Sequence, residues 1–286
     1  MRNSKRTDKW ALWAVSTLCL GIPAVFILVP ILAFVLNSLW HNDAGQLVKR
    51  LTLENYVAFF TDEDMRKVYF RTVFLCLSAT VTNLVVGYIC ALYIYRQKVG
   101  SRLVLILIFT LPLFTSYIIK MYAIRGILGH RGVINELLIA AHVIQEPITA
   151  FIFSQSAIFL TLVVLYLPFS VLPIYLAMER IPENLRLASD DLGGKESHEL
   201  KHIIFPLSLN GVVVAAVFTF VMTFGDFVTP QMVGGIDGYT FGRIVYSQFG
   251  VALNWPLGSA LAVILLATSV VVALLSSLLL KLGVSR

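Results

Sequence analysis

Long runs of apolar residues recur along the whole 286-residue chain, and they constrain its fold more than any other feature. A helix needs roughly 20 mostly apolar residues to cross a bilayer. Segments of this length occur at about Ala11–Trp40, Val68–Tyr95, Leu103–Ile124, Phe151–Met178, Leu207–Val228 and Trp255–Leu280. The sequence therefore predicts an all-α polytopic membrane protein with six transmembrane helices.

The composition supports this prediction. Hydrophobic residues make up 58% of the chain and charged residues 13%, with a mean hydropathy of +0.84. A soluble domain cannot hide that much apolar side chain, whereas a bilayer accepts helices that are apolar on every side. The net charge of +6 is too small to indicate a nucleic-acid partner. The apolar composition indicates membrane lipid as the surroundings of the chain. Cys19, Cys76 and Cys90 lie within apolar runs and are interpreted as small core residues.

The first apolar segment follows several basic residues within Arg2–Lys9, which is also typical of a signal peptide. Its run is too long for a signal peptide, and no small-residue cleavage site closes it. We therefore interpret it as a transmembrane helix, bent at Pro23 and Pro30.

Basic residues in the loops predict the orientation. With an even number of spans, both termini lie on one side, and that side carries more than half of the 22 Lys and Arg residues. Because cytoplasmic loops are enriched in these residues, we expect both termini in the cytoplasm. The bias is moderate, since further basic residues cluster within Lys49–Arg71 on the other side.

One predicted cytoplasmic loop, Glu179–Pro206, is long, charged and patterned. Pro182 suits the first position of a helix. Apolar residues then recur on one face of a short amphipathic helix, at Leu185, Ala188 and Leu192. A short helix held between two spans is typical of a docking element for a cytoplasmic partner.

The same loop resembles the EAA motif of importer permeases in the ABC transporter superfamily. The family pattern is Glu-Ala-Ala-x-x-x-Gly, nine variable residues and Ile-x-Leu-Pro, and Gly193, Ile203 and Pro206 stand at the matching spacing. Leu187-Ala188-Ser189 occupies the Glu-Ala-Ala position, so the Glu and any polar contact it makes are missing. The resemblance implies that an ATPase couples to Leu185, Leu187, Ala188, Ser189, Leu192, Gly193, Ile203 and Pro206.

The resemblance covers nearly the whole chain and is closest to the spermidine/putrescine-type permeases. It includes the segments Pro112–Ala123, Gly132–Asn135, Tyr166–Tyr175, Phe224–Gly235 and Asn254–Ala260. It implies a type I importer permease fold, with the first span as an accessory helix. The expected parts are a tail, accessory helix and outer loop at 1–66, a permease domain at 67–281 containing the coupling loop 179–206, and a tail at 282–286.

The resemblance also implies partners and a location. These are a second permease subunit, forming a heterodimer with this chain, two copies of a cytoplasmic ATPase and an extracytoplasmic solute-binding protein, at the bacterial inner membrane. The chain contains no G-x-x-x-x-G-K-[ST] phosphate-binding loop, so we expect no cofactor in it and assign ATP and Mg²⁺ to the ATPase. The implied substrate is a polyamine; an opine or another small organic solute is the alternative.

Two other classes of protein are weighed against this interpretation. His198-Glu199-Leu200-Lys201-His202 matches H-E-x-x-H, the zinc-binding pattern of metalloproteases, but no third ligand is evident and the match lies among the variable positions of the motif. A channel or secondary transporter would also have six spans, yet it has no need of a patterned docking loop.

Polar and ionisable residues within the spans are candidates for the substrate pathway, because such residues are costly in lipid. Asp226 either attracts an ammonium group, caps a helix end or pairs with the partner subunit. Tyr117 and Tyr122 either offer cation–π faces or pack as core residues, and Lys120 pairs with a carboxylate or reaches the interface. The full set is Asp226, Tyr117, Lys120, Tyr122, Asn83 and Thr115.

Overall fold

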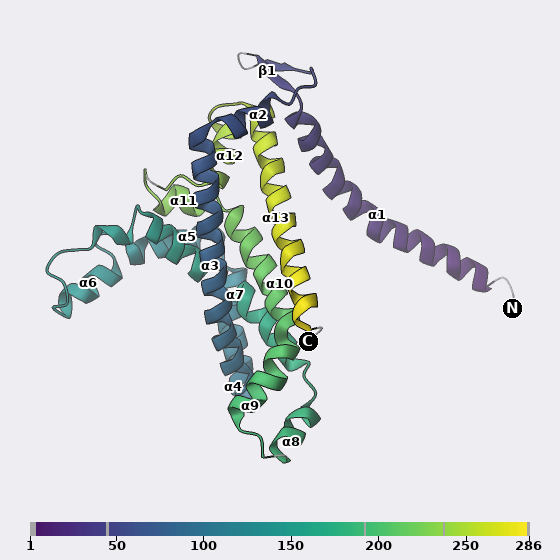
Figure 1. Cartoon of the computed structure of the whole chain (residues 1–286), viewed down its shortest axis with the longest axis vertical. Helices are drawn as coiled ribbons and strands as arrows, with labels where there is room; N and C mark the ends of the chain where they lie inside the picture. Colours follow the sequence, from purple (N-terminus) through teal and green to yellow (C-terminus); the bar gives the residue numbers. More distant parts are fainter. Residues whose placement is uncertain (1–3, 44–45, 192, 237, 285–286) are drawn as a thin grey trace. The chain divides into compact units, whose positions relative to one another are not determined.

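The computed structural model describes residues 4–43, 46–191, 193–236 and 238–284, and nearly all of its secondary structure is helical (Figure 1). The chain divides into two compact units. The larger comprises Glu63–Ile244 and Leu265–Arg286, and the smaller comprises Met1–Asp62 and Val245–Ile264. The prediction of an all-α fold is confirmed, with one short hairpin as the exception.

Three long helices, α3 (Glu63–Tyr95), α7 (Gln155–Glu179) and α10 (Phe205–Phe224), pack against one another in the larger unit (Figure 1). The buried residues of α3 form one stripe of mainly small side chains, including Thr72, Cys76, Ala79, Asn83, Gly87 and Ala91. A Cβ on Gly87 would collide with the side chain of Ser170 on α7, so the backbones approach closely there. Small residues are expected at such contacts, since lipid supplies no hydrophobic force between helices.

Five helices in the described residues are long and apolar enough to cross a membrane: Val15–Ser38, Glu63–Tyr95, Gln155–Glu179, Glu196–Phe224 and Trp255–Leu278. They correspond to five of the six predicted spans. A sixth crossing exists only if the bent pair Val99–Phe114 and Tyr117–Ala140 counts as one span, and the chain bends by 105° between the two arms of this pair.

The prediction of one continuous helix at Leu103–Ile124 is therefore wrong. The chain passes through a 3₁₀ turn at Leu111–Phe114 and is extended at Thr115, with φ −88° and ψ 146°. Pro112 lies in this turn, and its missing N–H cannot continue the helical hydrogen bonds. Apolar length alone does not reveal such a break.

The remaining helices are shorter. They are α4 (Val99–Thr110), α5 (Tyr117–Leu128), α6 (Val133–Ala140), α8 (Glu183–Asp191), α9 (Glu196–Glu199), α11 (Val228–Val233) and α12 (Phe241–Gly250), with a 3₁₀ turn at Thr149–Phe151 and a π turn at Leu200–Ile204. α8 is the short helix predicted in the coupling loop, and α9 follows it in the same loop.

The smaller unit contains α1 (Ser4–Ser38), the strands β1 (His41–Asp43) and β2 (Gln46–Val48), α2 (Glu54–Thr61) and the start of α13 (Trp255–Val284). α1 continues through both Pro23 and Pro30. None of the window of α1 that qualifies as a membrane span is buried in the protein, which fits a helix surrounded by lipid.

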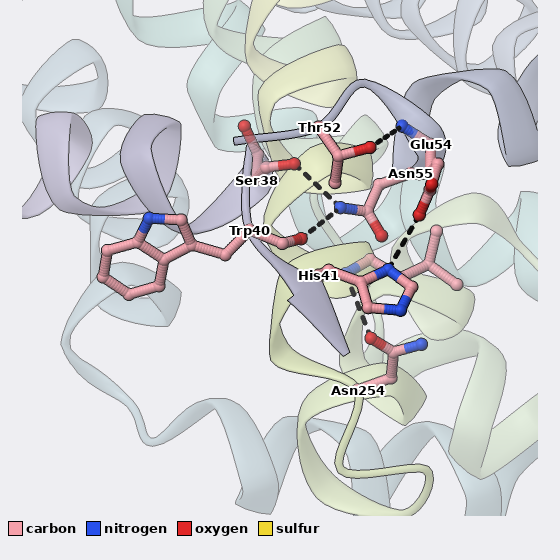
Figure 2. Close-up of polar contacts among 8 residues, drawn as sticks. Ser38, Trp40, His41, Thr52, Glu54, Asn55 and Asn254 are labelled. Atoms are coloured by element: carbon pink, nitrogen blue, oxygen red, sulfur yellow. Dashed lines mark hydrogen bonds and ion pairs between the residues drawn. The ribbon is translucent and has the colours of Figure 1, made fainter. Parts of the chain in front are cut away.

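The antiparallel hairpin, in which His41 pairs with Val48, and α2 were not predicted from the sequence. Figure 2 shows how they are joined to α1. The amide of Asn55 donates to the carbonyls of Ser38 at 2.9 Å and Trp40 at 2.8 Å, and His41 Nδ1 lies 2.7 Å from Glu54 Oε2. Carbonyls at the end of a helix have no helical N–H left to bond, so Asn55 stabilises the end of α1.

Candidate functional site

The coupling loop presents apolar side chains on its surface. On α8, Leu185 is 41% exposed and Leu187 is 57% exposed, and Ala188 is also exposed. Leu192, the last residue of the predicted stripe, lies outside the described residues. Exposed leucines on a short helix form an apolar surface that another protein can cover.

Ser189 differs from its neighbours, because it is buried and turned toward the loop that follows. Gly194 N donates to its carbonyl at 2.8 Å, and a Cβ on Gly194 would lie only 2.5 Å from Ser189 Oγ. Gly193 has φ +73°, the left-handed conformation that ends many helices and that glycine adopts most easily. The Gly-Gly pair thus folds the chain back over the end of α8.

A groove of about 610 Å³ lies between α8 and α9. Several predicted coupling residues line it, namely Leu185, Ala188, Ser189, Gly193 and Ile203. The structure thus brings these residues together, whereas Leu187 is exposed to solvent and does not line the groove, and Pro206 is the second residue of α10.

The H-E-x-x-H match does not form a metal site here. The rings of His198 and His202 stack at 4.1 Å, while Glu199 points to Arg186, whose Nε donates to Glu199 Oε1 at 2.6 Å. In the described part of the chain, no group of three His, Cys, Asp or Glu residues could hold a metal ion. Nothing in this geometry supports a zinc protease.

A second candidate site surrounds Asp226, in the turn between α10 and α11. The helix predicted to extend through Val228 ends at Phe224. Asp226 Oδ1 accepts from the backbone N–H groups of Val228 and Thr229, each at 3.0 Å, which is the geometry of a helix cap. The cap that the sequence left as one of three alternatives is present.

The other carboxylate oxygen of Asp226 accepts three hydroxyl groups. Oδ2 lies 2.7 Å from Tyr117 Oη, 3.1 Å from Tyr166 Oη and 2.6 Å from Thr229 Oγ1. Asp226 is only 8% exposed. All of these donors are neutral hydroxyl or backbone N–H groups. They stabilise the buried carboxylate by hydrogen bonds and not by an opposite charge.

Sequence reasoning did not single out Tyr166 or Thr229. Thr229 has a local signal, since an Asp three residues ahead of it is typical of a helix start. Tyr166 has no such signal: it comes from α7, 60 residues from Asp226 along the chain. Its place in the site depends on how α7 packs.

The other predicted pathway residues lie in different surroundings. Lys120 Nζ donates to the carbonyl of Pro112 at 3.2 Å and lies 5.9 Å from the centroid of the Tyr117 ring. Thr115 is exposed and donates to the same carbonyl at 2.8 Å. Both residues therefore stabilise the break between α4 and α5.

Tyr122 and Asn83 lie at opposite extremes of exposure. Tyr122 is 62% exposed, whereas Asn83 is fully buried in α3. Neither the nitrogen nor the oxygen of the Asn83 amide has a hydrogen-bond partner among the described residues. Neither residue is brought to Asp226 by any hydrogen bond or ring contact of the described residues.

Comparison with known proteins gives consistent results. Residues 83–283 match the family model described as binding-protein-dependent transport system inner membrane component. The inner membrane ABC transporter permease protein YdcU of Escherichia coli (strain K12) is 34% identical over 227 residues, which are 75% of this chain and 71% of that protein. The spermidine/putrescine transport system permease protein PotB of Salmonella typhimurium (strain SL1344) is 29% identical over 262 residues, 91% of this chain and 90% of that protein.

A solved structure shares the fold. A chain in the crystal structure of a bacterial ABC transporter involved in the import of the acidic polysaccharide alginate superposes with a TM-score of 0.76 at 14% identity. The match covers 98% of this chain and 99% of that chain. At this identity the likeness concerns the fold alone.

Proposed function

Since this chain belongs to the family of inner membrane components of binding-protein-dependent transport systems, we propose that it forms half of the pathway by which a polyamine enters the cell. The chain is the permease subunit of an ABC importer, with the type I importer fold, and it is not an enzyme. ATP hydrolysis belongs to a separate subunit. The inner membrane is its location, as its family and its apolar helices require.

The proposed complex contains this chain, a second permease subunit, two cytoplasmic ATPases and an extracytoplasmic solute-binding protein. The exposed leucines of α8 support docking to the ATPase, because the ATPase can cover their apolar side chains. Movement of the ATPases would then rock the spans and open the pathway to each side in turn.

The observation that carries the polyamine proposal is the Asp226 network. A buried carboxylate bonded by two tyrosine hydroxyl groups complements an ammonium group by charge, and the tyrosine rings can add cation–π attraction. The 29% identity to a spermidine/putrescine permease over most of both chains supports the same substrate class. An opine or another small organic solute remains the alternative.

The substrate proposal is tested by purifying the whole complex with its binding protein in lipid vesicles. We expect spermidine or putrescine to stimulate ATP hydrolysis and to accumulate inside the vesicles. Stimulation by an opine and none by either polyamine would favour the alternative.

Cytoplasmic placement of the coupling loop is tested by cysteine labelling. In a chain in which Cys19, Cys76 and Cys90 are replaced by alanine, Leu187→Cys should not react with a membrane-impermeant maleimide in intact spheroplasts. It should react after lysis, because Leu187 is 57% exposed. Ser189 is a poor probe here, since it is only 8% exposed and would be protected on either side.

A matched control is Leu51→Cys, in the predicted outer loop, where the side chain is 74% exposed. This thiol should react in intact spheroplasts. The predicted orientation is wrong if, in intact spheroplasts, Leu187→Cys reacts with the maleimide and Leu51→Cys does not.

A further inference from the structure

Arg186 joins the two helices of the coupling loop. It lies on α8, and its Nε donates to Glu199 Oε1 of α9 at 2.6 Å. The Glu199 side chain is 10% exposed and that of Arg186 is 38% exposed, so the carboxylate of this ion pair is buried and the guanidinium is partly exposed. The hydrogen bond to Glu199, as the largest cause, raises the pKa of the Arg186 guanidinium above its ordinary value.

The same guanidinium also contacts the last residue of α3. Arg186 Cζ lies 5.4 Å from the centroid of the Tyr95 ring, and Tyr95 is 6% exposed. Arg102 of α4 lies 5.9 Å from the same ring and donates to the Tyr95 carbonyl at 2.8 Å. A second guanidinium therefore holds Tyr95 in place.

Among the described residues, Arg186 makes the only side-chain hydrogen bond from α8 to another element. α8 lies beyond α9 at one end of the larger unit (Figure 1), and it is followed by Gly193 and Gly194. Glycine resists changes of backbone conformation least of all residues. On α8, Leu187 is exposed to solvent, and Leu185 is partly exposed where it lines the groove between α8 and α9, so both side chains are accessible to a partner.

We propose that Arg186, Glu199 and Tyr95 form a clasp that transmits the movement of the docked α8 to the spans. The inference rests on the proposed docking function of the loop. Glu199 leads through the π turn Leu200–Ile204 into α10, and Tyr95 ends α3. The clasp thus connects α8 to two of the three helices that form the core of the larger unit. Its residues are positioning residues that touch neither solute nor nucleotide.

The test measures solute taken up per ATP hydrolysed by the reconstituted complex. Glu199→Gln keeps the size of the side chain and removes its charge, and Arg186→Gln removes the guanidinium. Each variant should still copurify with the ATPase and hydrolyse ATP, while uptake per ATP falls at least about fivefold. The charge-swapped pair Arg186→Glu/Glu199→Arg should recover most of the lost coupling, since it restores the attraction.

A matched control is Arg96→Gln. It breaks the neighbouring pair in which Arg96 Nη1 lies 3.1 Å from Glu196 Oε2, and these side chains are 36% and 83% exposed. Exposed pairs contribute little, so this variant should transport normally. Equal losses in Arg96→Gln and Glu199→Gln would overturn the clasp as a specific link.

Tyr95 provides a second measurement that does not alter the buried charges. Tyr95→Phe keeps the ring and should couple normally, whereas Tyr95→Leu removes it and should lower uptake per ATP. Normal coupling in both Tyr95→Leu and Glu199→Gln would overturn the proposal.

Copurification of the ATPase separates coupling from docking. If the variants lose the ATPase that the unaltered chain retains, the residues serve docking and do not transmit movement. If the unaltered chain itself fails to copurify an ATPase, the proposed docking function is wrong.

Discussion

Gly193→Val is expected to leave the protein inserted in the membrane but to abolish most solute uptake while ATP hydrolysis continues. Gly193 has φ +73°, where an ordinary L-residue costs about 1–2 kcal/mol and a β-branched residue is a greater outlier. The valine would therefore change the turn that ends α8 and shift the exposed leucines. Uptake and ATP hydrolysis of the purified complex, measured together, check this result.

The cause of this expected loss lies in the backbone. A Cβ at Gly193 would meet nothing within 4 Å, so a steric clash cannot explain it. Gly193→Asn is the matched control, because asparagine tolerates the left-handed region better than valine does. We expect the asparagine variant to retain most uptake. Normal uptake by a well-expressed valine variant would contradict a coupling role for the turn.

Asp226→Asn is expected to reduce uptake of a cationic solute by at least roughly tenfold. The variant loses the charged acceptor for the ammonium group, and a hydrogen bond to a charged group contributes about 1.5–3 kcal/mol. The amide oxygen can still accept from the N–H groups of Val228 and Thr229, so the start of α11 should persist. The negative charge beside Tyr117 and Tyr166 is lost. The complex should therefore assemble and hydrolyse ATP, yet transport poorly.

Tyr166→Phe separates charge from hydrogen bonding at this site. It removes one hydroxyl that lies 3.1 Å from Asp226 Oδ2 and leaves the carboxylate charged. We expect a smaller loss of uptake than in Asp226→Asn. Failure of Asp226→Asn to assemble would indicate a structural ion pair with the partner subunit, since an unpaired buried charge is destabilising. A stable Asp226→Asn variant with undiminished uptake would remove the main physical support for a polyamine.

The positions of the spans were predictable because apolar length is a local property of the chain. Five predicted segments correspond to helices that can cross a membrane. The helix of the coupling loop was equally predictable. Pro182 marks its start and Gly193 marks its end, and the spacing of its apolar residues indicates which face is apolar. The break at Pro112 also had a local signal, but the length of the apolar run outweighed it. The short hairpin at His41–Val48 had no alternating pattern long enough to reveal it.

Only the tertiary structure decided which side chains meet. Tyr117 and Tyr166 reach Asp226 from 109 and 60 residues away, and Arg186 reaches Glu199 from 13. A helix that is apolar on every side carries little periodic pattern, so its sequence does not reveal which face packs inward. The partners of a buried polar group follow from that packing, through close contacts such as that of Gly87 with Ser170. Sequence alone therefore determined the membrane fold and the coupling loop, while packing determined the Asp226 network and the clasp.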